Sequence, residues 1–98
     1  MRVQEVSLEA YESILDDIPR LQKAILTEFI WAGEDGLTCD EVELQLYLRH
    51  QTASARVREL AQKGHIKDSG ERRATRSGRT AIVWVAVEPG KEEQEKLF

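Results

Sequence analysis

The chain has 98 residues, of which 41% are hydrophobic and 33% are charged. This size and balance predict one soluble globular domain with one core and argue against a disordered chain. No apolar run approaches the roughly 20 residues that a membrane-spanning helix needs. Residues 1–6 hold no apolar signal-peptide core, so we expect a cytoplasmic protein. The single cysteine, Cys39, rules out an internal disulfide.

Charge is distributed unevenly along the chain. Residues 1–48 carry 3 basic and 11 acidic side chains, residues 49–80 carry 9 and 3, and residues 81–98 carry 2 and 4, which gives the net charge of −4. A binding surface acts through its local potential, which extends over a Debye length of about 8–10 Å. The positive segment 49–80 therefore suits an anionic partner. Alternatively, the acidic and basic halves attract each other within one fold, or the acidic half binds a basic protein partner.

The first 36 residues predict two helices. Ser7 can cap a helix from Leu8 to about Asp17, and Pro19 ends that helix or opens the next. The second helix carries a broad apolar face from Leu21 to Trp31, and Gly33 and Gly36 mark its end. The first helix has an apolar stripe at helical spacing, made of Tyr11, Ile14, Leu15 and Ile18.

Two shorter helices follow, joined by a tight turn. Thr38 and Glu41 match a capping box, which starts a helix at Cys39 that runs to about Leu46. Tyr47–His50 is a break of three or four residues. The next helix runs from about Gln51 to Lys63, with Gly64 as its stop.

The period changes after Gly64 to that of a β-hairpin. Residues 65–69 predict a strand, Gly70 allows a bend or bulge, and Ser77-Gly78 is a turn signal. Residues 80–87 are mostly β-branched and uncharged, which predicts a strand buried on both faces.

The helix 51–63 is the candidate reading element. Ala53, Val57, Leu60 and Ala61 should pack inward, which leaves small residues near its start and basic or amide side chains further along. Small residues allow close approach to a DNA major groove, and Arg and Gln can pair with base edges. Glu59 either reads cytosine or orients Arg56. An ordinary surface helix is the alternative. The candidate DNA-binding residues of this helix are Gln51, Thr52, Ser54, Ala55, Arg56, Arg58, Gln62 and Lys63.

Four arginines lie within eight positions of the hairpin, with Glu71 as their one acidic neighbour. Arginine suits phosphate forks and narrow minor grooves, so these side chains are candidates for the DNA backbone or the minor groove. A solvated turn is the alternative. The four are Arg72, Arg73, Arg76 and Arg79.

Residues 36–87 resemble the winged-helix domains of small bacterial and bacteriophage DNA-binding proteins. The resemblance rests on the Thr38–Glu41 cap, the turn at residues 46–48, the helical segment Thr52–Leu60 and the hairpin segment 76–84. It implies DNA contact by Thr52, Ser54, Arg56 and Arg58 and backbone contact by Arg76 and Arg79. Tyr47 stands where such turns often have glycine, and a left-handed tyrosine is costly, so we expect a longer turn.

These observations predict an α+β, mostly α fold: a winged helix-turn-helix at 19–88 with an extra N-terminal helix at 1–18 and a charged tail at 89–98. The first helix packs on this domain or forms a dimer, and we favour the dimer because a winged helix closes without it. The expected function is non-catalytic binding of duplex DNA, most commonly for transcription regulation, with a phage or prophage as one setting. The alternative is a protein-interaction module of replication or transcription machinery.

Chemical sites are not indicated. The spacing of His50, His65 and Cys39 matches no zinc pattern, so we expect no metal, and no P-loop, nucleophile elbow or dinucleotide turn occurs. The acidic pairs Asp16-Asp17 and Glu34-Asp35 read as solvated helix ends. We expect the histidines in loops or near phosphates, Cys39 as a small packing residue, and Trp31 and Trp84 as core aromatics.

Overall fold

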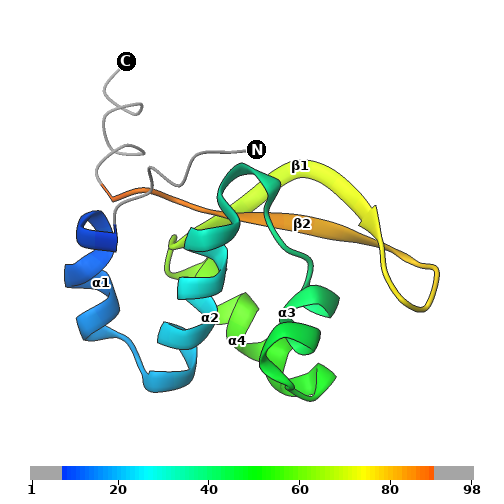
Figure 1. Cartoon of the computed structure of the whole chain (residues 1–98), viewed down its shortest axis with the longest axis horizontal. Helices are drawn as coiled ribbons and strands as arrows, with labels where there is room; N and C mark the ends of the chain where they lie inside the picture. Colours follow the sequence, from blue (N-terminus) through cyan, green and yellow to red (C-terminus); the bar gives the residue numbers. More distant parts are fainter. Residues whose placement is uncertain (1–7, 90–98) are drawn as a thin grey trace.

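The computed structural model describes residues 8–89 (Figure 1). It is mostly helical α+β, with four α-helices on one side of an antiparallel hairpin in a winged-helix-like arrangement. In chain order the elements are η1 (Leu8–Tyr11), α1 (Glu12–Asp17), α2 (Arg20–Ala32), η2 (Gly33–Asp35), α3 (Cys39–Leu46), α4 (His50–Gln62), β1 (Ile66–Ala74) and β2 (Thr80–Ala86). The predicted order of elements is confirmed. Ser7 and the tail beyond residue 89 lie outside the described residues.

One hydrophobic core joins the four α-helices, η1 and the two strands. Its centre is α2, whose buried residues Ile25, Leu26, Phe29 and Ile30 pack against Val57 and Leu60 of α4 and their neighbours. Tyr11 and Leu15, at the start of the chain, are buried in the same core. The apolar stripe of the first helix therefore covers this chain's own core and is not a free dimer face.

The turn between α3 and α4 has three residues, 47–49. The capping box at the start of α3 is confirmed, because the Glu41 N–H donates to Thr38 Oγ1 (3.2 Å) and the Thr38 N–H donates to Glu41 Oε1 (2.9 Å). The expectation of a longer turn is wrong. Tyr47 itself takes the left-handed conformation (φ 55°, ψ 47°) that ends α3, and its side chain is 94% exposed.

The hairpin pairs Ile66 with Ala86 at one end and Ala74 with Thr80 at the other. The register shifts between Asp68 and Arg72, around Gly70 at φ 93°, so the predicted bulge is confirmed. Leu37, just before α3, also bonds to β2: its N–H and carbonyl pair with the carbonyl and N–H of Trp84 at 3.0 and 2.9 Å. This bridge extends the hairpin by a third short segment.

Two predictions about burial are wrong. Residues 80–87 are not buried on both faces: within β2 only Val83 is fully buried, because a single hairpin has helices on one side only. Trp31 is not a core aromatic either. It lies in the last turn of α2 and is 48% exposed, whereas Trp84 is partly buried and packs against the core.

Candidate nucleic-acid interface

The outer face of α4 carries positive, neutral polar and small side chains and no carboxylate. Gln51, Arg58 and Gln62 are exposed, and Ser54 and Ala55 are half-buried beside them. Glu59 is the only acidic residue of α4, and its carboxylate turns away towards α2. The Arg58 side chain makes no hydrogen bond or ion pair within residues 8–89. This face is therefore open to an electronegative partner.

A polar network holds the opposite flank of α4 against α2. Gln22 of α2 is only 5% exposed; its Nε2 donates to Glu59 Oε1 (2.8 Å) and its Oε1 accepts from Lys63 Nζ (2.7 Å). Arg56 Nη2 donates to the other oxygen of Glu59 (2.9 Å), and Arg56 Nε is buried with no partner. Two predicted DNA contacts, Arg56 and Lys63, thus also make hydrogen bonds within the fold. Of the two interpretations of Glu59, the one in which it orients Arg56 matches this geometry.

Arg76, at the hairpin turn, is bound by two carboxylates of α3. Its Nε donates to Asp40 Oδ1 (2.8 Å), its backbone N–H donates to Asp40 Oδ2 (3.1 Å), and its Nη2 donates to Glu43 Oε1 (3.0 Å). The side-chain hydrogen bond from Arg76 is the main reason that the pKa of Asp40 lies below its usual value, and the same bond raises the pKa of Arg76. We call this contact, together with the contact between Arg73 and Glu41, the α3–hairpin clamp.

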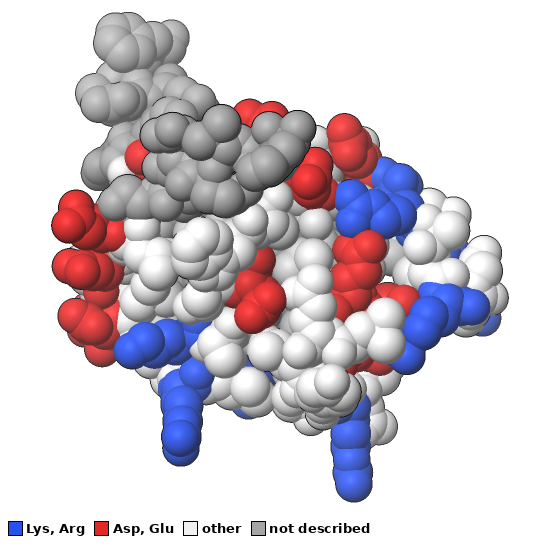
Figure 2. Space-filling model, in the orientation of Figure 1, with Lys and Arg blue, Asp and Glu red and all other residues white. Residues whose placement is uncertain are grey.

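Arg73 makes the second contact of the clamp. Its Nη1 forks onto both oxygens of Glu41 (2.7 and 3.0 Å), and its Nη2 donates to the backbone carbonyl of Asp35 (2.7 Å). Arg72 pairs within its own strand with Asp68, at 3.1 Å. The internal attraction between the acidic and basic halves, left open by the sequence, therefore occupies two of the four hairpin arginines, Arg73 and Arg76, while Arg72 pairs within the basic segment itself. Figure 2 shows blue and red side chains alternating on the side of the hairpin, while acidic residues gather over α1.

Arg79 differs from the other three hairpin arginines. It is exposed, and its side chain makes no ion pair with any residue in the described part of the chain. The hairpin turn is closed beneath it by backbone bonds, from the Thr75 N–H to the Arg79 carbonyl (2.8 Å) and from the Gly78 N–H to the Thr75 carbonyl (2.9 Å). Of the predicted hairpin contacts, Arg79 is the one whose charge no described residue compensates.

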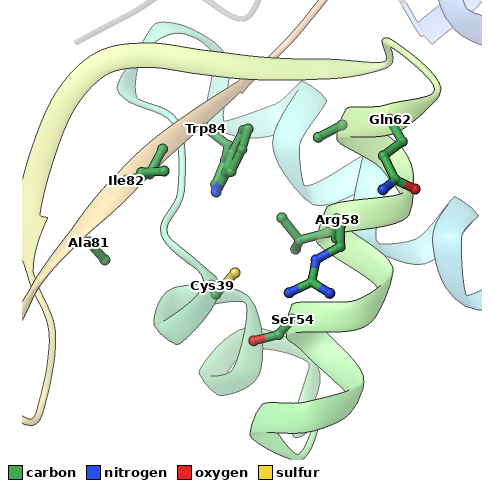
Figure 3. A pocket seen from close by; sticks show the side chains of 9 residues that line it. Cys39, Ser54, Arg58, Gln62, Ala81, Ile82 and Trp84 are labelled. Atoms are coloured by element: carbon green, nitrogen blue, oxygen red, sulfur yellow. The ribbon is translucent and has the colours of Figure 1, made fainter.

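A groove of about 470 Å³ separates α4 from β2. Figure 3 shows Ser54, Arg58 and Gln62 facing it from α4, Cys39 from the start of α3, and Ala81, Ile82 and Trp84 from β2. The Trp84 ring points into the space with its nitrogen foremost. Burial raises the pKa of the Cys39 thiol, which therefore stays neutral at neutral pH. The groove has an apolar floor and polar groups at its rim.

The two histidines lie near the two ends of α4. His50 is exposed at the first position of α4, where Nδ1 lies 2.7 Å from Glu43 Oε2. His65 follows α4, and burial lowers its pKa. Residues 8–89 hold no group of three or more His, Cys, Asp or Glu side chains arranged for a metal ion, and none of the helices among them is long and apolar enough to cross a membrane.

The sequence predicts neither the acidic partners of the hairpin arginines nor the groove. Asp40 and Glu43 are three residues apart, which places them on one face of α3, and the charge contrast between the two halves was the available signal. The groove had no signal, since its lining comes from three elements that meet only in the fold.

No known family model matches the chain, and no curated protein matches it. Among solved structures, it is similar to a possible transcriptional regulator from Methanosarcina mazei Go1, with a TM-score of 0.62 and 12% sequence identity. The match covers 88% of this chain and 69% of that one. At this identity, the likeness concerns the fold: the helical arrangement with its hairpin is shared with a protein described as a possible regulator.

Proposed function

We propose that the chain is a non-catalytic duplex DNA-binding protein that inserts α4 into the major groove and acts in transcription regulation. The observation that carries the proposal is the outer face of α4, which presents Gln51, Arg58 and Gln62 with no carboxylate. Arginine and glutamine can each make paired hydrogen bonds to base edges. The polar network on the other flank holds α4 rigidly against α2, which is what a reading helix requires.

The α3–hairpin clamp reduces the number of arginines that are available to contact the DNA backbone. Arg73 and Arg76 are already paired with α3, which leaves Arg49, Arg58 and Arg79 as exposed arginines of this region without an ion pair within residues 8–89. Each phosphate neutralised contributes about −0.9 to the slope of log K against log salt. Three contacts therefore give a slope of about −3. This slope is shallower than the slope of about −4 to −5 that four to six contacts would give.

Fluorescence anisotropy with a pool of random duplexes, measured at several salt concentrations, tests the proposal. Arg58→Gln should weaken binding and make the salt slope shallower by about 0.9, the share of one neutralised phosphate. Arg20→Gln is the matched control, because it removes the same charge at an exposed residue that is not among the proposed DNA contacts, the first residue of α2. Binding that is absent or independent of salt, or that responds equally to both variants, would refute the proposal.

A protein-interaction module is the second candidate. It is favoured by the compensated charge of the hairpin and by two exposed hydrophobic side chains at the end of α3, Leu44 (49%) and Tyr47 (94%). The same titration separates the two candidates, because an interaction module would leave every duplex unbound even at low salt.

A further inference from the structure

Two of the side chains that line the groove between α4 and β2 carry donor-only groups that nothing in the described chain uses. These groups are the guanidinium of Arg58 and the indole N–H of Trp84, and neither has a hydrogen-bond partner within residues 8–89. Both are donors that cannot accept. A group that satisfies them must be an acceptor, and one that faces a guanidinium is best an anion.

The rest of the lining is uncharged and mostly apolar, with Ser54 and Gln62 as neutral polar side chains of α4. Val57, Ala61, Ala81 and Ile82 supply aliphatic surface, and Cys39 supplies a neutral thiol. Arg58 is therefore the only charged residue among the described residues that line the groove. A volume of about 470 Å³ falls within the range of roughly 300–1,000 Å³ that small-molecule sites occupy, and an apolar lining with a few placed polar groups is their usual composition.

We propose that this groove binds a small monocarboxylate with an apolar body. The carboxylate accepts hydrogen bonds from Arg58 and from the Trp84 indole N–H. The aliphatic or aromatic body lies on the apolar floor between α4 and the hairpin (Figure 3).

Occupancy of this groove would regulate DNA binding. This step rests on the proposed function, since Arg58 belongs both to the groove and to the outer face of α4. A carboxylate bound to Arg58 withdraws that guanidinium from DNA and neutralises its charge. By linkage, the ligand and the DNA then lower each other's affinity by the same factor.

Tryptophan fluorescence measures the binding directly and without DNA. Trp31→Phe removes the second tryptophan, which does not line the groove, so that Trp84 reports alone. The probe is 4-phenylbutyrate, and its neutral control is 4-phenylbutanol, which keeps the apolar body. We expect saturable quenching by the acid, with the alcohol binding at least about tenfold more weakly because it lacks the charge-assisted bond.

Two variants in the Trp31→Phe background test the assignment. Arg58→Gln should weaken the acid about tenfold while leaving the alcohol unchanged, and Ala61→Leu, which fills the groove from α4, should weaken both. Arg20→Gln should change neither. Equal binding of acid and alcohol, no response to Arg58→Gln, or no quenching would overturn the proposed site.

The regulatory step has its own readout. If duplex DNA binds, saturating 4-phenylbutyrate should release it from the parent chain and not from Ala61→Leu, whose groove is filled. Release from both would overturn the regulatory role, and so would retention by both. If the acid binds and DNA does not, the carboxylate site stands and the proposed function fails, so the two failures can be told apart.

Discussion

Replacing Tyr47 by glycine should stabilise the protein. Tyr47 has φ 55° and ψ 47°, and the left-handed conformation costs a residue with a Cβ about 1–2 kcal/mol. Its side chain is 94% exposed, so its removal forfeits little burial. Glycine also lowers the stability by about 0.5–1 kcal/mol, because it increases the conformational entropy of the unfolded chain. The net gain is about 0.5–1 kcal/mol, or an increase in Tm of about 2–8 °C for a domain of this size.

Tyr47→Ala is the matched control. Alanine lacks the ring but keeps the Cβ, and therefore keeps the strain, so its stability should stay within about 0.5 kcal/mol of the parent chain. Urea unfolding followed by circular dichroism, with heat unfolding of the same three proteins, measures both differences. A glycine variant no more stable than the alanine variant would show that the backbone at residue 47 is not strained in the folded state.

Three further changes test other parts of the fold. Gly36→Ala should destabilise by about 2–4 kcal/mol in urea unfolding, because a Cβ there would overlap the Trp84 carbonyl oxygen and lie 2.6 Å from the Val83 side chain, at φ 64°; a loss below 1 kcal/mol would contradict this close approach. Gln22→Leu should cost about 1–3 kcal/mol, since Glu59 and Lys63 lose their shared partner, and unchanged stability would show that the network is not needed. Folding lowers the pKa of Asp40. The stability that its carboxylate contributes is therefore present above the unfolded pKa of about 3.9 and is lost as the pH falls through the folded pKa. The parent chain should therefore exceed Asp40→Asn in stability at about pH 6 and lose that advantage progressively as the pH falls below the unfolded pKa. An advantage independent of pH would refute the assignment.

The features that the sequence predicts well are local ones. The capping box depends on two residues three apart, and the bulge at Gly70 depends on one glycine at positive φ. These patterns act within a few residues and do not depend on the tertiary context. The sequence therefore predicts the element order, and it predicts the bounds of α3 and α4 to within about a residue.

The features that the sequence does not predict are pairings over long separations. Arg76 meets Asp40 across 36 positions and Gln22 meets Glu59 across 37, and no local pattern says which carboxylate an arginine or a glutamine will meet. Residue type alone placed Trp31 in the core, whereas its position on the open side of α2 leaves it half-exposed. The number of arginines in the hairpin is therefore larger than the number whose charge is left unpaired by the described residues.

The carboxylate of Glu41 links two stages of folding. Its Oε1 caps α3 through the Thr38 N–H and also receives Arg73 from a strand 32 positions later. Helical turns close in under a microsecond and hairpins more slowly, so α3 can form with its cap in place and present a ready acceptor to the arriving hairpin. The start of α3 and the paired strand should then open together in native-state hydrogen exchange, as one cooperative unit. A change at Glu41 would be felt at both ends of that unit at once.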